Sequence, residues 1–168
     1  MRFSNFILSL TLTFGYFYGY SGSLDEVREF FYEINSENQI DKMLAWDATN
    51  FSQDELLVLQ AYQGICQSMK AQYFFSPISK LKSFNEGRRR LEQSIAQEQG
   101  VENTYLRLLL QLSTPKMLGY NTYIEEDINY LQMHLPKSKF DPAMKSMMMK
   151  ALISANDGNI DLSKLVQI

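Results

Sequence analysis

The sequence predicts an all-α fold, in which about four antiparallel helix pairs stack into an irregular helical bundle with little or no sheet. Three observations predict it. Helix start motifs recur along the chain, and the apolar residues between them step by three and four positions. No stretch alternates apolar and polar residues between hairpin turns. The short turns between helices favour antiparallel neighbours.

Start and stop signals divide the chain into eight expected helices. A serine or threonine with Glu or Gln three residues later forms a capping box, which satisfies free backbone N–H groups at a helix start. A capping residue directly before proline marks a start as well, because the first helical position needs no N–H group. The expected ranges are 24–34, 37–47, 53–74, 77–98, 102–112, 122–135, 142–156 and 161–167.

The first three helices each begin at a capping box, led by Ser23, Ser36 and Ser52. An apolar stripe follows the third helix, which predicts one continuous buried face. Its members are Leu59, Tyr62, Cys66, Met69 and Tyr73.

The fourth helix begins at Ser76-Pro77 and is expected to end before Gly100. Its stripe predicts a second buried face. The members of that stripe are Leu81, Phe84, Leu91 and Ile95. The fifth helix is apolar nearly all round over residues 105–112, so it is expected to be the most buried element.

Three further motifs mark starts in the last third of the chain. Thr122 begins a capping box, and Thr114-Pro115 and Asp141-Pro142 place a capping side chain before proline. Gly158 is expected to end the helix over 142–156.

The first 23 residues predict a secretory signal peptide, followed by a single domain over residues 24–168. Arg2 precedes an uncharged apolar run from Phe6 to Tyr20, and small residues follow at 21–23. The run is shorter than the roughly 20 apolar residues that a membrane-spanning helix needs. An uncleaved anchor is the alternative. We expect an exported protein, periplasmic or secreted, with no stable membrane insertion after cleavage.

Charge and cysteine content narrow the possible partners and compartment. The chain carries −3, and the leader contains one base and no acid, so the mature chain would carry −4. This balance argues against nucleic-acid binding and against adhesion to anionic membranes. One cysteine, Cys66, cannot form an internal disulfide, and an exported domain without disulfides is typical of the bacterial periplasm.

Two resemblances add to the fold expectation. Gly87, Leu91 and Ser94 are spaced like the small and large positions of a tetratricopeptide hairpin, with Gln99 where its proline usually falls. Residues 55–135 are also similar to a group of small exported bacterial proteins of uncharacterised function. The segments that carry this second likeness are 77–81 with Phe84 and Gly87, then Leu106-Arg107, then 118–121 with Ile124 and Asp127. Both imply a helical fold and neither implies an activity.

No catalytic set stands out, so the sequence predicts neither an enzyme nor a cofactor. Cys66 lies on an apolar stripe and is expected to be a core residue. His134 shares a helix face with Asp127 and Tyr130, but Asp127 is about two turns away, roughly 10 Å, and no metal site is predicted. We expect a surface histidine.

Methionines are concentrated in the helix over 142–156. Thioether groups select copper(I), which makes periplasmic copper binding an admissible alternative. Core packing by Met144 and Met148, with Ala151, Leu152 and Ala155, is the preferred interpretation.

Two arginines occupy apolar positions, which predicts a buried ion pair or an anion site. Arg88 falls between Phe84 and Leu91, and Arg107 lies inside the fifth helix. A buried guanidinium needs a partner, and Asp127 at the start of the next helix is the preferred one. A pocket for a small anion is the alternative.

These observations predict an exported, non-catalytic interaction or scaffold module whose partner is a protein or peptide. The step from fold to function rests on analogy with helix-pair stacks, which bind peptides and partner helices. The second hypothesis is a periplasmic protein that binds a small anion or copper.

Overall fold

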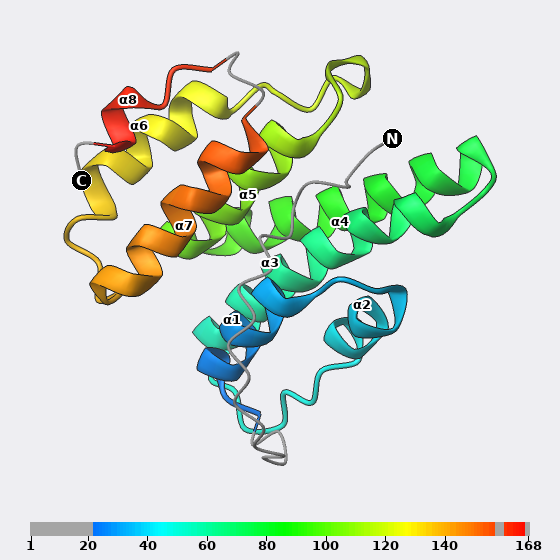
Figure 1. Cartoon of the computed structure of the whole chain (residues 1–168). Coiled ribbons are helices and arrows are strands. Elements are labelled where there is room, and N and C mark those ends of the chain that lie inside the picture. The colour runs from blue at the N-terminus through cyan, green and yellow to red at the C-terminus, as the bar shows by residue number, and fades with distance from the viewer. Residues whose placement is uncertain (1–21, 157–159, 167–168) are drawn as a thin grey trace. The chain divides into compact units, whose positions relative to one another are not determined.

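The structure, a computed structural model, describes residues 22–156 and 160–166, and it confirms the all-α prediction. Within these residues the chain forms eight α-helices and two short 3₁₀ turns, without a strand (Figure 1). They divide into two compact units, residues 22–98 and residues 99–166, which are described separately.

The predicted leader lies outside the described residues, apart from Gly22 and Ser23. The boundary between a leader and a single domain therefore stays a prediction. In the part of the chain that the structure covers, no helix has both the length and the apolar character needed to span a membrane.

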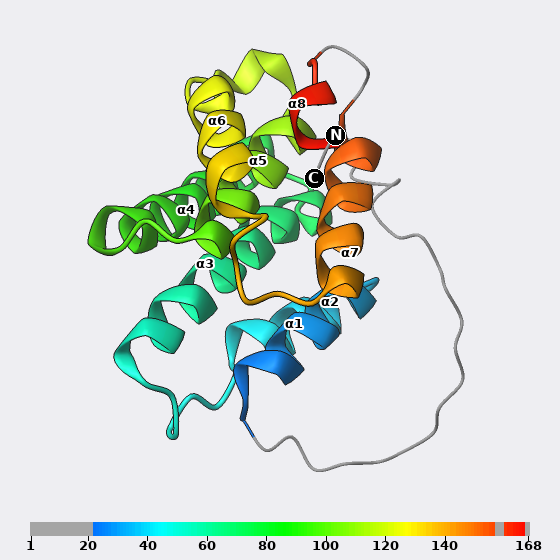
Figure 2. The same cartoon turned by 90° about the vertical axis from the view of Figure 1, so that its left-hand side faces the viewer.

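The first unit is built on a long helical hairpin. Its elements are α1 (Leu24–Glu33), α2 (Glu37–Leu44), α3 (Gln53–Lys70), the 3₁₀ turn η1 (Ala71–Tyr73) and α4 (Pro77–Gln97). Helices α3 and α4 form the hairpin, and both α1 and α2 pack on α3 (Figure 2). The expected helix ranges hold within a few residues, except that the third helix tightens into η1 before its expected end.

Helices α3 and α4 approach closely because small residues line their crossing. A Cβ atom on Gly87 would lie 2.3 Å from the carbonyl oxygen of Gly64 and 2.3 Å from Oγ of Ser68. The Ser68 hydroxyl donates to the carbonyl oxygen of Gly64 at 3.1 Å and faces that of Phe84 at 3.3 Å. Glycine is therefore required at position 87 by the space between the helices.

Two serine hydroxyl groups of α4 also donate hydrogen bonds to backbone carbonyl oxygens of α3. Ser83 donates to Gln67 at 2.8 Å, and Ser94 donates to Leu57 at 2.7 Å. These hydrogen bonds satisfy buried polar groups where the two helices meet.

The predicted apolar stripes of α3 and α4 are buried except towards the end of the hairpin. Cys66 on α3 and Phe84 on α4 are in the core. Tyr73 and Leu81 were expected on the same buried faces, but they are 37% and 48% exposed. That part of the prediction is wrong, because helical spacing shows which residues share a face but not where the covering elements stop.

The second unit surrounds its first helix. Its elements are α5 (Val101–Ser113), the 3₁₀ turn η2 (Lys116–Leu118), α6 (Ile124–His134), α7 (Pro142–Ala155) and α8 (Ser163–Val166). Helices α6 and α7 pack on α5, and α8 packs on α6. Every residue from Glu102 to Gln111 is buried, as the nearly uniform apolar character of α5 predicts.

Helix starts in the first half of the chain follow the predicted caps closely. Ser52 and Glu55 form a complete capping box on α3. On α1, the Ser23 hydroxyl accepts from the N–H of Glu26 at 3.3 Å, while the Glu26 carboxylate accepts from the N–H of Gly22 at 3.2 Å. Ser36 precedes α2 but makes no side-chain cap.

Two predicted starts are wrong. Helix α6 begins at Ile124, and Thr122 does not cap it. Thr114 ends α5 instead of starting a helix, and its hydroxyl donates to the carbonyl oxygen of Leu110 at 2.6 Å. Helix α4 ends at Gln97, before Gly100 as predicted, and Gly100 is also the N-cap of α5. The predicted helix end at Gly158 lies outside the described residues. At the two wrong starts, a competing hydrogen bond sets the boundary.

Candidate functional site

A buried ionic cluster joins α5 to the start of α6. Arg107 is 4% exposed and Asp127 is 0% exposed. Nε of Arg107 donates to the two carboxylate oxygens of Asp127 at 3.1 and 3.0 Å, and Nη2 donates to Oδ1 at 2.5 Å. The amide of Gln111 donates to Oδ2 at 2.7 Å. The structure thus brings together the two residues that the sequence analysis paired.

Tyr123 and Glu126 complete the surroundings of the guanidinium. The ring of Tyr123 lies 4.4 Å from Cζ of Arg107, within the range of a cation–π contact. Oε1 of Glu126 lies 3.6 Å from Nη2. The side-chain oxygen of Gln111 accepts the backbone N–H of Tyr123 at 2.9 Å, which accounts for the late start of α6.

Burial determines the protonation of Asp127. Desolvation raises the pKa of its carboxyl group from 3.8 to about 6, against the lowering effects of Arg107 and Gln111. At neutral pH the ionised carboxylate pairs with the guanidinium, and it takes up a proton at a higher pH than an ordinary aspartate does.

The cluster is arranged as an internal ion pair. The Arg107 guanidinium faces two carboxylates and an aromatic ring, so the cluster has no excess of positive charge to attract an anion. Arg88, the other predicted arginine, belongs to the first unit. Its side chain is half-buried on α4. The residues on the same face of the helix, Phe84 and Leu91, are buried.

Cys66 is 0% exposed, and burial raises the pKa of its thiol strongly. Since the thiolate is the reactive form, we expect a thiol reagent such as DTNB to label native protein slowly and denatured protein quickly. Labelling followed at 412 nm with and without urea measures the two rates. Equal rates would place Cys66 outside the core.

His134 is exposed at the end of α6, and its ring stacks on Tyr130 with centroids 4.3 Å apart. Among the described residues, no three His, Cys, Asp or Glu side chains are placed to hold one metal ion. Of the core face predicted on α7, Met148, Leu152 and Ala155 are buried, whereas Met144 and Ala151 are half-buried. Met147 is 36% exposed.

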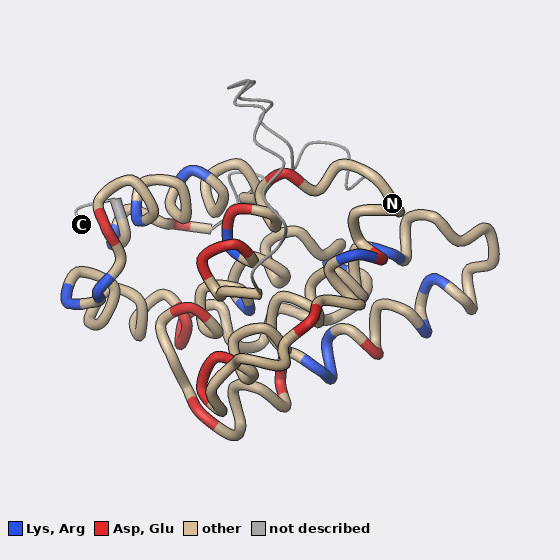
Figure 3. The backbone as a smooth tube through the Cα atoms, turned by 90° about the horizontal axis from the view of Figure 1, so that it is seen from below, with Lys and Arg blue, Asp and Glu red and all other residues tan. Residues whose placement is uncertain are grey.

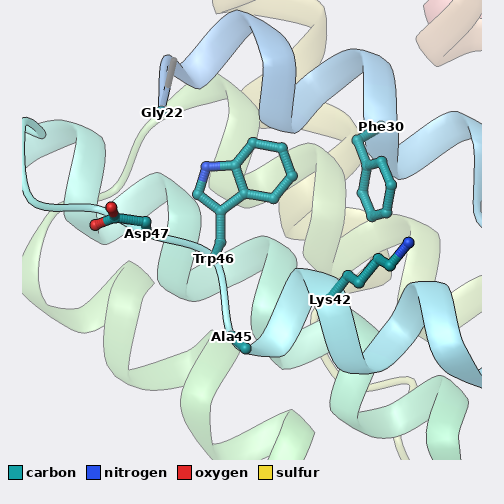
Figure 4. A pocket seen from close by; sticks show the side chains of 6 residues that line it. All are labelled: Gly22, Phe30, Lys42, Ala45, Trp46 and Asp47. Carbon is teal, nitrogen blue, oxygen red and sulfur yellow. The ribbon is translucent and has the colours of Figure 1, made fainter. Parts of the chain in front are cut away.

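A pocket of about 350 Å³ lies between α1 and the chain that follows α2 (Figure 4). The indole of Trp46 and the ring of Phe30 line it, with centroids 5.5 Å apart and planes tilted by 52°. Gly22, Lys42, Ala45 and Asp47 complete its lining. This volume is within the range of ligand pockets, at the size of one or two large apolar side chains.

The end of α2 positions Trp46. Helix α2 stops at Leu44, and the Gln63 amide of α3 donates to the carbonyl oxygens of Met43 and Leu44, both at 3.3 Å. Asp41 and Lys70 form an ion pair that also ties α2 to α3. Held by these contacts, the chain leaves α2 with the indole directed towards α1 (Figure 4).

Opposite charges lie on two sides of the apolar pocket. Lys42 extends beside the ring of Phe30, whereas the carboxylate of Asp47 points away from the indole (Figure 4). The hydroxyl and backbone N–H of Thr49 donate to Oδ1 of Asp47 at 2.5 and 3.0 Å and lower the pKa of this carboxyl group. Asp47 therefore stays ionised, and the rim can orient a ligand that carries both charges or a peptide dipole.

The sequence did not predict this pocket. Neither Trp46 nor Phe30 belongs to a motif, and their contact depends on how α1 packs beside the end of α2. One available signal was composition: Trp46 is the single tryptophan of the chain and lies where the apolar spacing of one helix ends. Aromatic residues in such connecting segments are frequent in binding sites.

No protein-family model, no curated protein and no solved structure matches this chain. The likeness to tetratricopeptide hairpins and to exported bacterial proteins therefore stays a prediction.

Proposed function

We propose that this chain is an exported, non-catalytic helical interaction module that binds a peptide segment of a partner protein. The observation that carries this proposal is the Trp46 pocket, which presents two aromatic rings between an exposed cation and an exposed anion. An apolar side chain of the peptide would enter the pocket and pack against the contacting rings of Trp46 and Phe30, and Lys42 and Asp47 would orient the peptide backbone.

The chemistry of the pocket supports a peptide more than a small anion or copper. Aromatic anchors dominate the binding energy of protein interfaces, and an apolar pocket with a charged rim is typical of such sites. The buried arginine that could have held an anion already faces two carboxylates. Met148 is part of the core, which favours packing as the role of the methionine-rich helix.

Photo-crosslinking can test the proposal. Ala45 is exposed and lines the pocket, so Ala45→p-benzoylphenylalanine should capture the bound segment in cells that make the protein. Ala143 is an exposed alanine of α7 in the other unit, and the same replacement there is the matched control. A synthetic copy of the captured segment should then change the emission of Trp46.

Affinity measurements decide the outcome. If the indole anchors the peptide, Trp46→Ala should weaken binding about 30-fold in calorimetry, the effect expected of a hot spot of about 2 kcal/mol. A segment captured equally from positions 45 and 143, or bound equally well by Trp46→Ala, would contradict the proposal.

A further inference from the structure

The end of the α3–α4 hairpin exposes an apolar surface of four residues. They are Tyr73, Phe75, Ile78 and Leu81, referred to below as the hairpin tip. Phe75 is fully exposed at 102%, and Ile78 is 81% exposed. The Asp41–Lys70 ion pair shows that α2 covers α3 as far as its last turn, and the hairpin tip follows that turn. Here the apolar stripes of the hairpin continue without cover from their own unit.

The hairpin tip itself carries positive charge, and the nearest acidic group on α4 is Glu86, whose Oε1 lies 4.0 Å from Nζ of Lys82. From Leu56 to Asn85 the chain contains three lysines and no acidic residue. Lys80 and Lys82 lie on the first turns of α4, next to Ile78 and Leu81. In Figure 3 this end of the hairpin, on the right, carries blue segments and no red one. The remainder of the chain is acidic, since the whole chain carries −3.

We propose that the hairpin tip binds the surface of an anionic phospholipid membrane. Phe75 and Ile78 would enter the boundary between headgroups and acyl chains, where aromatic and aliphatic side chains lose contact with water. Lys80 and Lys82 would contact the lipid phosphates, each lysine near the surface adding to the affinity. Such shallow binding needs no spanning helix.

Charge complementarity selects a membrane over a second copy of the chain. Two hairpin tips facing each other would bring four lysines together, against the two Glu86 carboxylates that lie 4.0 Å from the Lys82 side chains, which is unfavourable. An anionic lipid surface attracts the lysines and repels the acidic remainder of the chain, so the same charges also orient the protein. The acidic whole-chain balance, which argues against membrane adhesion, therefore does not describe this local surface.

Sedimentation with vesicles tests the proposal on the chain without its leader. The probes are vesicles of pure phosphatidylcholine and vesicles with 30% phosphatidylglycerol. We expect binding to the second kind and little to the first. Phe75→Ser with Ile78→Ser should lower the partition coefficient about 50-fold, because the inserted apolar area is lost. Lys80→Gln with Lys82→Gln should lower it about 30-fold and weaken its dependence on salt.

A matched variant controls for the loss of exposed apolar residues in general. Met117 and Ile153 are exposed on the other unit, so Met117→Ser with Ile153→Ser should bind the vesicles as the parent does. Equal partition of the tip variant and the parent would overturn the proposal, as would a parent that ignores anionic vesicles. Capture of a protein by a photo-crosslinker placed at position 75, without any vesicle binding, would overturn the proposal and show that a protein groove holds the hairpin tip.

Insertion can also be observed directly. Phe75→Trp should give a blue-shifted emission that brominated lipids quench, whereas Trp46 of the parent should not be quenched. The hairpin tip and the Trp46 pocket share no residue. The peptide and vesicle experiments can therefore fail independently.

Discussion

Arg107→Ala should lower the free energy of unfolding by about 3–5 kcal/mol at pH 7.5, because it leaves the buried Asp127 carboxylate without its cation. Urea denaturation followed by circular dichroism measures this loss. Arg89→Ala removes an exposed arginine and should change stability by less than about 0.5 kcal/mol.

The double variant Arg107→Met with Asp127→Leu should recover much of the lost stability. It removes both charges and keeps the apolar volume, so no unpaired charge stays buried. If Arg107 instead served an external anion, Arg107→Ala would unfold at the same urea concentration as the parent. That result would mean that Arg107 serves to bind a ligand and does not stabilise the fold.

The cost of Arg107→Ala should also depend on pH. The pKa of Asp127 is raised to about 6, so between about pH 4 and 6 the folded parent holds a proton that the unfolded chain has lost. The contribution of this group to stability is therefore present at low pH and falls as pH rises through 6. Without Arg107, which lowers the pKa, the carboxyl group should stay protonated to higher pH. The variant should be closer to the parent at pH 5 than at pH 7.5.

Gly87→Ala should destabilise the first unit by about 3 kcal/mol, because a Cβ atom at this position overlaps backbone atoms of α3. The sign of this stability change distinguishes close helix packing from intrinsic helix propensity. Intrinsic helix propensity alone predicts a gain of about 1 kcal/mol when alanine replaces glycine inside a helix. Trp46 lies in the same unit, so its fluorescence in a urea titration reports the effect.

Gly100→Ala is the matched control for the close helix contact. A Cβ atom on Gly100 would have no atom within 4 Å, and the loss should stay below about 1 kcal/mol, the cost of a poorer N-cap. If Gly87→Ala were as stable as the parent, the α3–α4 pair would have to tolerate a wider separation than the structure shows.

Local chemistry explains what the sequence predicted well. The Ser52–Glu55 box and the Asp141–Pro142 start depend on residues within one helical turn, and both caps are present. Pairing of Arg107 with Asp127 was predictable for a different reason. A charge inside a nearly all-apolar helix needs a partner, and the next helix offered acids in its first turn.

Tertiary packing explains what the sequence did not predict. Leu81 has the spacing of a core residue, but the covering elements end before they reach it. Tyr123 and not Thr122 precedes α6, because Gln111 of α5 binds its N–H group. Trp46 and Phe30 are 16 residues apart and share no periodic pattern, so their contact follows from helix packing alone.

The predicted cleavage site lies beside the Trp46 pocket. The Ser23 hydroxyl caps α1, and its neighbour Gly22 lines the Trp46 pocket. If a peptidase cuts after Ser23, the mature helix begins with an ammonium group at its positive end and lacks a cap worth about 1 kcal/mol. The first turn of α1 would then loosen, and one wall of the pocket would leave with the leader. Cleavage after Ser23 would therefore widen the pocket, and the precursor and the mature protein would differ in affinity for the same peptide.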